Sequence, residues 1–427
     1  MYGLPTIAIT ATLMVFVTHA WARTTGPLER QAQRFVHLAT SLGKARPAEV
    51  DAYFGPRDLD DRRRATTPSL SALQDATQEL MRDIQQSRGD GRRAQLLERV
   101  RSLNGLFTVL QNPQRLEFDR EARLIYDIAP GVGDQALAED VRRQLESLLP
   151  GSRSLADRVA AFRQQFVVPT QKRVAVFARA LEECRARTTA KWPLPNGEGV
   201  TVVWTHDVIS AWHGYEGHYR STLKINPAAV AFLGSAIDVA CHEGYPGHHA
   251  QFVLEEMSAG QFGLPVEDTI VMLRSRDSML REAAAEYGVE LVFPPDARLA
   301  FERDVLFPLA GLDASQAERY VKVNRLIREL GASTVPILRA YRDGHLSIDS
   351  ASQGLQSSAL VSSPAALLKF VDELGPYVLG YTVAPVNLRG YIEASSKASH
   401  EDPWSLLRRI LEHEDVRAVT NVPGAYD

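Results

Sequence analysis

Residues 241–251 read Cys-His-Glu-Gly-Tyr-Pro-Gly-His-His-Ala-Gln, and this stretch decides how the whole chain is interpreted. A histidine beside a glutamate can hold a metal-bound water next to the base that deprotonates it. Zinc hydrolases commonly use this pair as His-Glu-x-x-His on a single helix, where the two histidines lie on one face. The stretch therefore predicts a zinc site in which His242 is a ligand and Glu243 is the general base.

The spacing of the histidines differs from that helical motif. Between His242 and His248 an unbroken helix would turn by about 240° and rise by about 9 Å, so the two imidazoles could not reach one ion. Pro246 lacks the N–H that would bond the carbonyl of His242, and Gly247 has a permissive backbone. We expect this Pro-Gly pair to break the helix and return His248 towards His242. His249 remains open as a further or alternative ligand.

A polar turn with hydrogen-bonded histidines is the plain alternative, because Pro-Gly pairs are common at helix ends. The distribution of histidines argues against it. The chain has eleven histidines, and six of them fall within one short stretch: His206, His213, His218, His242, His248 and His249. The first three could line a cleft, but exposed positions in loops are the simpler interpretation for each.

Length and composition indicate a globular protein with a sizeable core. The chain has 427 residues, of which 45% are hydrophobic, enough for one large domain or two lobes. The formal net charge is -4, with both signs mixed along the sequence. A nucleic-acid-binding protein would carry a basic patch. We therefore expect no nucleic-acid partner.

The first 22 residues resemble a signal peptide. An apolar stretch runs from Leu4 to Val17 and is followed by Ala20-Trp21-Ala22, a small-x-small cleavage pattern. An uncleaved anchor is the alternative, although the stretch is short for a membrane span. No cysteine lies nearby to carry a lipid, and no later segment is apolar enough to span a bilayer. We expect a periplasmic or secreted protein, cleaved near Ala22, with no stable membrane span afterwards.

The remaining sequence divides near Trp192. Residues 23–192 carry helical patterns, and residues 193–427 begin with strand-like segments before further helices. The expected helices before the division are 28–42, 70–84, 94–110, 136–149 and 155–181, and those after it are 269–292, 314–330, 335–343, 365–374 and 404–413. Strands are expected at 200–204 and 219–225, and Asn226-Pro227 is expected to open the helix that leads into the histidine motif. The predicted fold is mainly α, with an N-terminal helical scaffold and a small β-sheet beside the active-site helices of a catalytic region.

Three glutamates on one predicted helix supply a candidate third ligand. Glu282, Glu286 and Glu290 recur at intervals of four and so lie near one helix face. A solvated acidic face is the usual explanation. The small residues Ala283–Ala285 and Gly288, however, suit a helix packed closely against another element. A carboxylate from a second helix would complete a three-ligand catalytic site.

Two cysteines and two tyrosines are the remaining candidates. Cys184 and Cys241 permit one disulfide in an oxidising compartment, or they are small buried residues, and neither has an identifiable partner for nucleophilic catalysis. Tyr377 and Tyr381 follow a Gly-Pro turn, where a hydroxyl could donate a hydrogen bond to a developing oxyanion. Core or rim aromatic residues are the alternative interpretation.

The motif His242-Glu243-x-x-Pro246-Gly247-His248-His249-x-Gln251 resembles the signature of the bacterial domain-of-unknown-function 885 family. These proteins are grouped with the zincin-like metallopeptidases of the glutamate-zincin type. The resemblance is close over the motif and loose over most of the mature chain. The family's downstream Glu-Gly-Trp-Ala-x-Tyr pattern is similar to residues 282–287, with alanine at the Gly and Trp positions.

The resemblance implies roles for individual residues. Glu282 would be the third zinc ligand, and Glu286 would orient a ligand histidine without binding the metal itself. The family's late Pro-x-x-x-x-Tyr region is similar to residues 376–381, which favours Tyr381 over Tyr377 as the oxyanion donor.

These observations predict an exported zinc-dependent metallopeptidase. One zinc ion would be held by His242, His248 and Glu282, with Glu243 as general base and Tyr381 as oxyanion donor, acting on a peptide or small amide. One alternative is a zinc-dependent amidase or esterase with a non-peptide substrate. Another alternative is a non-catalytic helical binding protein of the cell envelope with a structural or lost metal site. A metal site closed by four protein ligands would favour this alternative. The sequence does not distinguish endopeptidase from exopeptidase activity. It also leaves open which divalent metal is bound and what the oligomeric state is.

Overall fold

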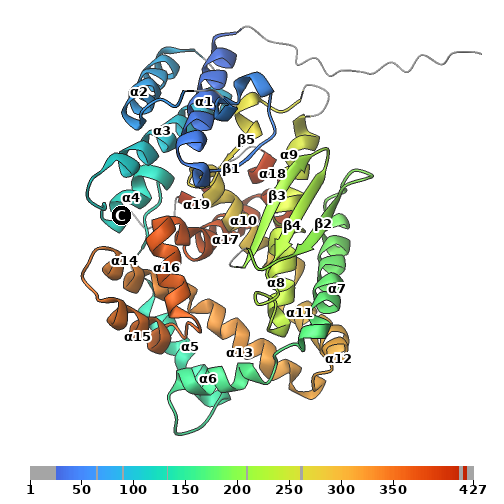
Figure 1. Cartoon of the computed structure of the whole chain (residues 1–427). Helices are drawn as coiled ribbons and strands as arrows, with labels where there is room; N and C mark the ends of the chain where they lie inside the picture. The colour runs from blue at the N-terminus through green and yellow to red at the C-terminus, as the bar shows by residue number, and fades with distance from the viewer. Residues whose placement is uncertain are drawn as a thin grey trace, which may run out of the picture.

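A computed structural model describes residues 26–63, 66–88, 91–131, 133–207, 210–259, 263–412 and 417–420. The protein is mainly helical and contains two small β-sheets (Figure 1). The predicted mainly α fold with a small sheet is therefore confirmed. The predicted signal peptide, residues 1–22, lies outside the described residues.

The first part of the chain is a succession of helices, as predicted. They are α1 (Pro27–Ala45), α2 (Leu70–Gln86), α3 (Gly91–Gln111), α4 (Phe118–Tyr126), α5 (Gln135–Leu148), α6 (Leu155–Gln164) and α7 (Thr170–Thr189). Each of the longer helices turns an apolar stripe inwards; in α1, for example, Phe35, Leu38 and Leu42 are buried. Figure 1 shows α1 to α4 grouped at one end of the molecule and α5 and α6 at the other.

The prediction of one helix over residues 155–181 was wrong, because α6 and α7 are separate helices. Pro169 lies at the N-cap of α7, and a proline restricts the residue before it to extended conformations. The backbone between α6 and α7 forms hydrogen bonds with a later segment instead of continuing a helix. Val168 N donates to Ala231 O over 2.8 Å, and Val167 pairs with Phe232. This contact joins the helical part of the chain to the start of the motif helix.

A three-stranded sheet follows α7. It contains β2 (Gly199–Trp204), β3 (Ala211–Gly217) and β4 (Arg220–Ile225) in the order β2-β4-β3, with β4 parallel to β2 and antiparallel to β3. The two predicted strands are confirmed. The third, β3, was not predicted, because Gly214 and Gly217 interrupt its apolar alternation.

The second sheet joins distant parts of the chain. Strand β1 (Val50–Tyr53) pairs antiparallel with β5 (Ile270–Met272). The predicted helix over residues 269–292 was therefore wrong in its first turns, where β-branched residues extend along β1. Helix α10 (Arg276–Val292) begins after Ser275, whose hydroxyl accepts a hydrogen bond from Ser278 N and so caps the helix.

The histidine motif is divided between two helices, α8 (Leu233–Glu243) and α9 (His248–Ala259). The predicted start of α8 at Asn226-Pro227 was wrong. Residues 226–232 form turns first, with Ala229 N donating to Asn226 O over 2.9 Å.

The rest of the chain is helical. It forms α11 (Pro295–Phe301), α12 (Phe307–Ala310), α13 (Ala317–Glu329), α14 (Val335–Arg342), α15 (Ile348–Ser358), α16 (Pro364–Leu374), α17 (Ala384–Ser399), α18 (Pro403–Glu412) and α19 (Arg417–Thr420). The predicted helices at 314–330, 335–343, 365–374 and 404–412 are confirmed, the first with an initial 3-10 turn. Residue 413, the predicted end of the last helix, lies outside the described residues.

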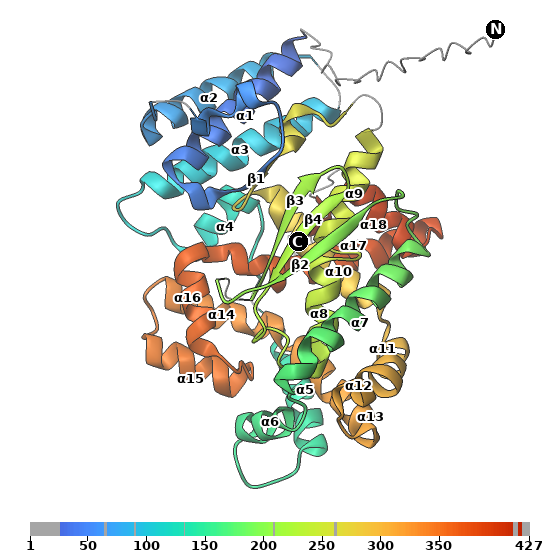
Figure 2. The same ribbon diagram turned by 45° about the vertical axis from the view of Figure 1, so that its right-hand side comes forward.

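Helix α10 lies in the middle of the molecule, behind the three-stranded sheet (Figure 2). It contacts α3, α4, α7, α8, α9 and the C-terminal helices α17 to α19. Its small residues permit this: a Cβ added to Gly288 would lie 2.7 Å from Pro246 Cγ. One continuous apolar cluster runs from Ala32 to Val419, so residues on both sides of Trp192 share a core. The division between residues 192 and 193 as a domain boundary stays a prediction.

The two cysteines form a disulfide between α7 and α8. The Cα atoms of Cys184 and Cys241 are 5.4 Å apart. Of the two interpretations of these residues, the bridge is the one found in the structure. It ties the helix that carries His242 to the N-terminal helical part.

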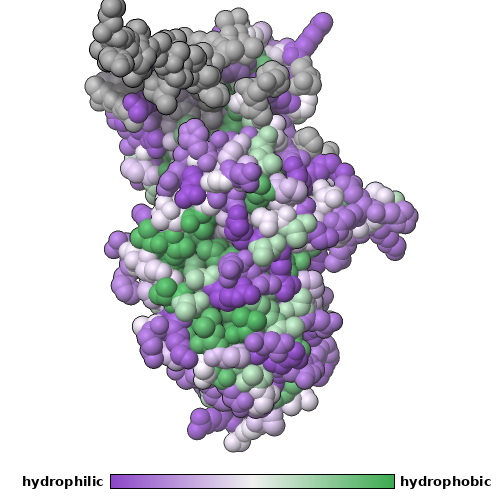
Figure 3. Space-filling view, turned by 90° about the vertical axis from the view of Figure 1, so that its right-hand side faces the viewer, coloured by the Kyte–Doolittle hydropathy of each residue, from purple (hydrophilic) through white to green (hydrophobic). Residues whose placement is uncertain are grey.

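Polar side chains cover much of the surface, and apolar ones gather in the middle of the face seen in Figure 3. Among the described residues, no helix has both the length and the apolar character needed to cross a bilayer.

Candidate metal centre

The helix that carries the motif is interrupted between α8 and α9 at the predicted Pro-Gly pair. Helix α8 ends at Glu243, the Tyr245-Pro246 peptide bond is cis, and α9 begins at His248. Gly247 N donates to Cys241 O over 3.0 Å, which closes the turn. A Cβ on Gly247 would lie 1.7 Å from His242 O, so only glycine fits at this position.

This turn brings the two motif histidines together. The ring centroids of His242 and His248 are 4.8 Å apart, and the rings are nearly perpendicular at 87°. Glu282 reaches them from α10: its Oε2 lies 3.2 Å from His242 Nε2, and its Oε1 lies 3.6 Å from His248 Nε2. One ligand atom from each of the three residues lies within 4.8 Å of the others.

These residues fit a zinc ion. Two imidazole nitrogens and a carboxylate oxygen are the donors of many catalytic zinc sites. Glu282 Oε2 is buried and forms no hydrogen bond with a described residue, although His242 Nε2 lies 3.2 Å from it. A buried carboxylate oxygen without a donor is costly unless a cation satisfies it. The donor set and this oxygen therefore suit a metal ion between the three side chains.

Opposite charges act strongly on the ligand residues. Burial lowers the pKa of His242, but the carboxylates of Glu282 and Glu286 outweigh it and raise the pKa well above its usual value. Burial raises the pKa of Glu282, and the positive charges of His248 and His242 outweigh that effect and hold it well below its usual range. The carboxylates thus favour positive charge at the point where the imidazoles meet.

Only two of the three glutamates on α10 face the site. Glu286 Oε1 lies 3.1 Å from His242 Nδ1, the ring nitrogen directed away from Glu282. The two atoms lie at ion-pair distance without forming a hydrogen bond, so Glu286 acts on the His242 ring through its charge. Glu290 lies on the exposed surface and forms an ion pair with Arg389. The solvated acidic face considered from sequence therefore applies to Glu290 alone.

Glu243 lies at the end of α8, beside the ligands, with 9% of its surface exposed. Among the described residues, none forms a hydrogen bond or ion pair with its carboxylate. Burial raises the pKa of Glu243, against the opposing charges of His242 and His248. A carboxylate with a raised pKa and no fixed partner is suited to exchange protons with a water molecule.

Two tyrosines of the segment Gly375–Tyr381 approach Glu282. This segment packs closely, since a Cβ on Gly380 would lie 3.0 Å from Glu282 Cβ. The buried Tyr377 hydroxyl donates to Glu282 Oε1 over 2.7 Å. The ring of Tyr381 stacks on His242, with centroids 5.9 Å apart and planes at 19°.

Tyr381 is the more accessible of the two tyrosines. It is 38% exposed, yet its hydroxyl lies inside the site, where burial and the charges of Glu282 and Glu243 raise its pKa well above the usual value. A neutral hydroxyl at this position remains a hydrogen-bond donor.

His249 is directed away from this centre. Adjacent helical residues point about 100° apart. His249 is fully buried, its Nε2 lies 2.9 Å from Glu198 Oε2 and its Nδ1 lies 2.7 Å from Ser221 Oγ. The possibility that His249 joins or replaces His248 as a ligand does not agree with this arrangement.

The same network contains His213 of β3. His213 Nε2 lies 2.9 Å from Ser221 Oγ, and its ring centroid lies 5.8 Å from that of His248. The interpretation of His213 as a solvated loop histidine was wrong, because it is buried on the inner face of β3. His206 and His218 are exposed, as expected.

Glu198 anchors the network and was missed from the sequence. It accepts hydrogen bonds from His249, from the Tyr245 hydroxyl over 2.6 Å and from Arg185. Burial opposes ionisation, but these bonds lower the pKa of Glu198 to about 2. Its sequence context, a Gly-rich turn before β2, carries no motif that marks it.

A matched pair of variants separates the two adjacent histidines. His249→Ala is expected to retain one zinc per chain but to lower the free energy of unfolding by about 3 kcal/mol, because buried hydrogen bonds to Glu198 and Ser221 are lost. His248→Ala is expected to lose zinc with a smaller effect on the metal-free protein. Zinc analysis and urea unfolding measure both. Loss of zinc in His249→Ala and its retention in His248→Ala would contradict the assignment.

No protein-family model matches the sequence, and no curated protein matches it. Three solved structures are similar at 12–13% identity. A candidate lipoprotein from Colwellia psychrerythraea has a TM-score of 0.49, 12% identity, and coverage of 82% of this chain and 68% of that chain. A candidate lipoprotein of unknown function from Shewanella oneidensis has a TM-score of 0.45, 13% identity, and coverage of 83% and 73%. A crystal structure named BsuCP has a TM-score of 0.42, 12% identity, and coverage of 92% and 89%.

Proposed function

We propose that this protein is an exported zinc-dependent metallopeptidase with a zincin-like active site of the domain-of-unknown-function 885 type. The observation that carries the proposal is the convergence of His242, His248 and Glu282, with Glu243 beside them. The Pro-Gly turn makes this convergence possible despite the unusual spacing of the histidines.

His242, His248 and Glu282 would hold the metal. A zinc ion with three such ligands acts as a Lewis acid and lowers the pKa of a bound water. The number of ligands supports a catalytic rather than a structural site, because a structural zinc has four protein ligands and His249 is engaged by Glu198 and Ser221. This disfavours the alternative of a non-catalytic binding protein.

The remaining residues have distinct roles in the proposed reaction. Glu243 takes a proton from the attacking water and passes it to the leaving amine. Tyr381 donates a hydrogen bond to the substrate carbonyl oxygen as negative charge develops on it. Glu286 and Tyr377 hold His242 and Glu282 in their orientations.

The position of β3 favours a peptide over a non-peptide amide or ester. This strand is the edge of its sheet, and His213 on it lies beside the ligand His248. An edge strand offers backbone N–H and C=O groups that an extended peptide can pair with, whereas a small ester or amide cannot use them in series.

Export agrees with the disulfide between Cys184 and Cys241. Such bonds persist in oxidising compartments and are rare in the cytosol. The proposed location of the mature protein is the periplasm or the outside of the cell, and removal of the signal peptide near Ala22 is part of the same proposal.

Metal analysis combined with a substrate screen tests the proposed function. The purified mature chain is expected to contain one zinc, to cleave members of a mixed peptide library, and to lose both properties after chelation, with recovery on zinc addition. A panel of simple esters and non-peptide amides is the comparison. Cleavage of the panel but not the library would favour the amidase or esterase, and a chain that binds no metal would refute the proposal.

Two tyrosine variants separate the roles assigned to Tyr381 and Tyr377. Tyr381→Phe is expected to lower kcat by about 10²-fold with little change in KM, because the lost hydroxyl acts as charge develops. Tyr377→Phe is expected to weaken zinc binding by about tenfold, because its hydroxyl holds the ligand Glu282. Steady-state kinetics and zinc titration measure the two effects. An unchanged kcat in Tyr381→Phe would remove it from the reaction.

A further inference from the structure

His213 lies on β3 beside the metal centre, where its ring packs against two others. The ring centroid of His213 lies 5.8 Å from that of the ligand His248 and 5.4 Å from that of Phe252 on α9. The planes of His213 and Phe252 are within 9° of parallel. Among the described residues, the cluster that could hold a metal contains His242, His248 and Glu282 but not His213. His213 therefore borders the metal centre through direct contacts without belonging to its ligands.

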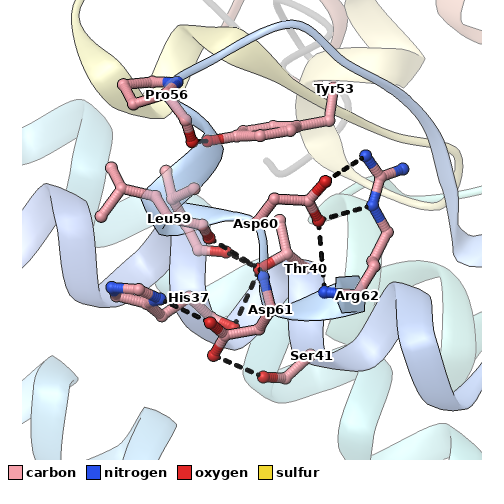
Figure 4. A network of polar contacts seen from close by, with 10 residues as sticks. His37, Thr40, Ser41, Tyr53, Pro56, Leu59, Asp60, Asp61 and Arg62 are labelled. Carbon is pink, nitrogen blue, oxygen red and sulfur yellow. Dashed lines mark hydrogen bonds and ion pairs between the residues drawn. The ribbon is translucent and has the colours of Figure 1, made fainter. Parts of the chain in front are cut away.

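The ring on which His213 stacks is itself held in place. Phe252 contacts Phe54, the residue after β1, with ring centroids 6.5 Å apart. The segment that follows Phe54 is fastened to α1 by the polar network in Figure 4, in which the Thr40 hydroxyl donates to Leu59 O over 3.1 Å. This packing gives the His213 ring a defined position on the inner face of β3.

A chain of buried hydrogen bonds determines which ring nitrogen of His213 carries the proton. The chain begins at Glu198, which bonds the Arg185 guanidinium and His249 Nε2. A carboxylate can only accept, so His249 Nε2 carries a hydrogen. Arg185 already balances the charge of Glu198, and His249 is fully buried, so its neutral ring is favoured. His249 Nδ1 is therefore an acceptor.

The same rule extends to His213 through Ser221 of β4. Ser221 Oγ lies 2.7 Å from His249 Nδ1 and 2.9 Å from His213 Nε2. Because a hydroxyl has one hydrogen and His249 Nδ1 has none, Ser221 donates to His249 and accepts from His213. His213 is buried, and among the described residues none forms an ion pair with it, so its neutral ring is favoured. The proton of His213 then lies on Nε2, and Nδ1 carries a lone pair.

This lone pair is directed towards the outer edge of β3. The two nitrogens of an imidazole point to nearly opposite sides of the ring. Since His213 Nε2 points to Ser221 on β4, Nδ1 points away from β4, and β3 is the outermost strand of its sheet. In the described part of the chain, no residue forms a hydrogen bond with Nδ1. An extended peptide that pairs with this edge would bring backbone N–H groups to it.

We propose that His213 binds the substrate as a hydrogen-bond acceptor, taking one backbone N–H of an extended peptide on Nδ1. The assignment rests on the proposed peptidase function. Glu198, His249 and Ser221 are then positioning residues, because they keep the proton on the other nitrogen of the ring. A site built to accept an N–H rejects a residue that lacks one, so proline is disfavoured at that position of the substrate.

Peptide binding to the zinc-loaded mature chain tests this assignment without turnover. The background carries Glu243→Gln. The probes are N-acetylated penta-alanine peptides with a C-terminal fluorophore, one unmodified and a series in which an ester oxygen replaces one backbone N–H at each position in turn. His213→Phe removes both ring nitrogens and keeps an aromatic ring on Phe252. The matched control is His345→Phe, at an exposed histidine after α14.

One ester probe is expected to bind about tenfold more weakly than the unmodified peptide, because it leaves His213 Nδ1 without a donor. His213→Phe is expected to abolish the loss at that position and to retain losses at positions that pair with the β3 backbone. His345→Phe is expected to bind every probe like the background. Fluorescence anisotropy measures the dissociation constants.

The position of the proton is measured separately, by ¹⁵N NMR of the histidine rings in the native chain. The His213 signals are assigned by their loss in His213→Phe, and His213→Asn replaces this variant in both measurements if the phenylalanine variant does not fold. A protonated Nε2 and an unprotonated Nδ1 are expected. Ser221→Ala is expected to remove this preference, because the hydroxyl that accepts from Nε2 is lost.

A proton on His213 Nδ1, the absence of any ester position whose loss depends on His213, or no binding of any probe would overturn the assignment. The proposed function fails separately. If the native chain cleaves no peptide while the His213-dependent loss holds, the role of His213 stands and the peptidase proposal falls. If the native chain cleaves peptides and no loss depends on His213, only the assignment of His213 falls.

Discussion

Glu243→Gln is expected to abolish peptide hydrolysis while one zinc ion stays bound to each chain. Glutamine has nearly the same shape as glutamate but cannot take a proton from water at neutral pH. The three ligand residues are unchanged, and Glu243 forms no hydrogen bond or ion pair with the described residues, so little structure depends on its charge. We expect kcat/KM to fall by about 10³-fold or more.

The matched control for this variant is Glu290→Gln. Glu290 belongs to the same series of glutamates on α10 as the ligand Glu282, but it lies on the surface and pairs with Arg389. Its substitution is expected to change kcat/KM by less than about twofold, because exposed ion pairs contribute little. Kinetics on a cleavable peptide and zinc analysis of both variants measure these effects. Undiminished turnover in Glu243→Gln would rule out its role as general base.

Gly247→Ala is expected to destroy the metal centre by preventing the turn between α8 and α9. The added methyl group would lie 1.7 Å from His242 O and 2.5 Å from Cys241 O, both backbone atoms that a side-chain rotation cannot move away. Either α8 must unwind at its end or α9 must shift, and His242 and His248 then separate. We expect a loss of about 3 kcal/mol or more in the free energy of unfolding, together with the loss of tight zinc binding.

Gly390→Ala is the control for the glycine substitution itself. Gly390 lies in the interior of α17, and an added Cβ would meet no atom within 4 Å. Alanine is favoured over glycine inside a helix by roughly 0.5–1 kcal/mol, so this variant is expected to be slightly more stable than the native chain. Urea unfolding of the metal-free proteins and zinc titration compare the two. If Gly247→Ala binds zinc like the native chain, the turn does not determine the site.

The local part of the metal centre was predictable from sequence, because proline and glycine act on the backbone where they stand. The break at Pro246-Gly247 followed from the backbone chemistry of proline and glycine, whereas the approach of His248 to His242 was expected because two histidines that bind one ion must meet. The regular spacing of three glutamates among small residues marked the helix, and the resemblance of residues 282–287 to the family pattern selected Glu282 on it. That spacing did not distinguish Glu282 and Glu286, which face the site, from Glu290, which does not.

The non-local part could not be predicted in the same way. The pairing of β1 with β5 joins residues far apart in the chain, and each strand is too short to show a pattern of its own. Periodicity therefore assigned residues 270–272 to a helix. Glu198 carries no motif either, and its role depends on Tyr245 and His249, which only the folded chain brings to it.

The short β1–β5 ladder also bears on when the candidate metal centre can form. Strand β1 (residues 50–53) pairs with β5, which directly precedes the helix that carries Glu282. Both histidines lie between β1 and β5 in the sequence. A chain in which β1 has not yet met β5, or one cut after Trp192, can present the histidine motif but lacks the support that β1 gives to the segment before Glu282. The three candidate ligands thus come together only once distant segments have met, so a metal ion would be held by the folded chain and not by the isolated histidine motif.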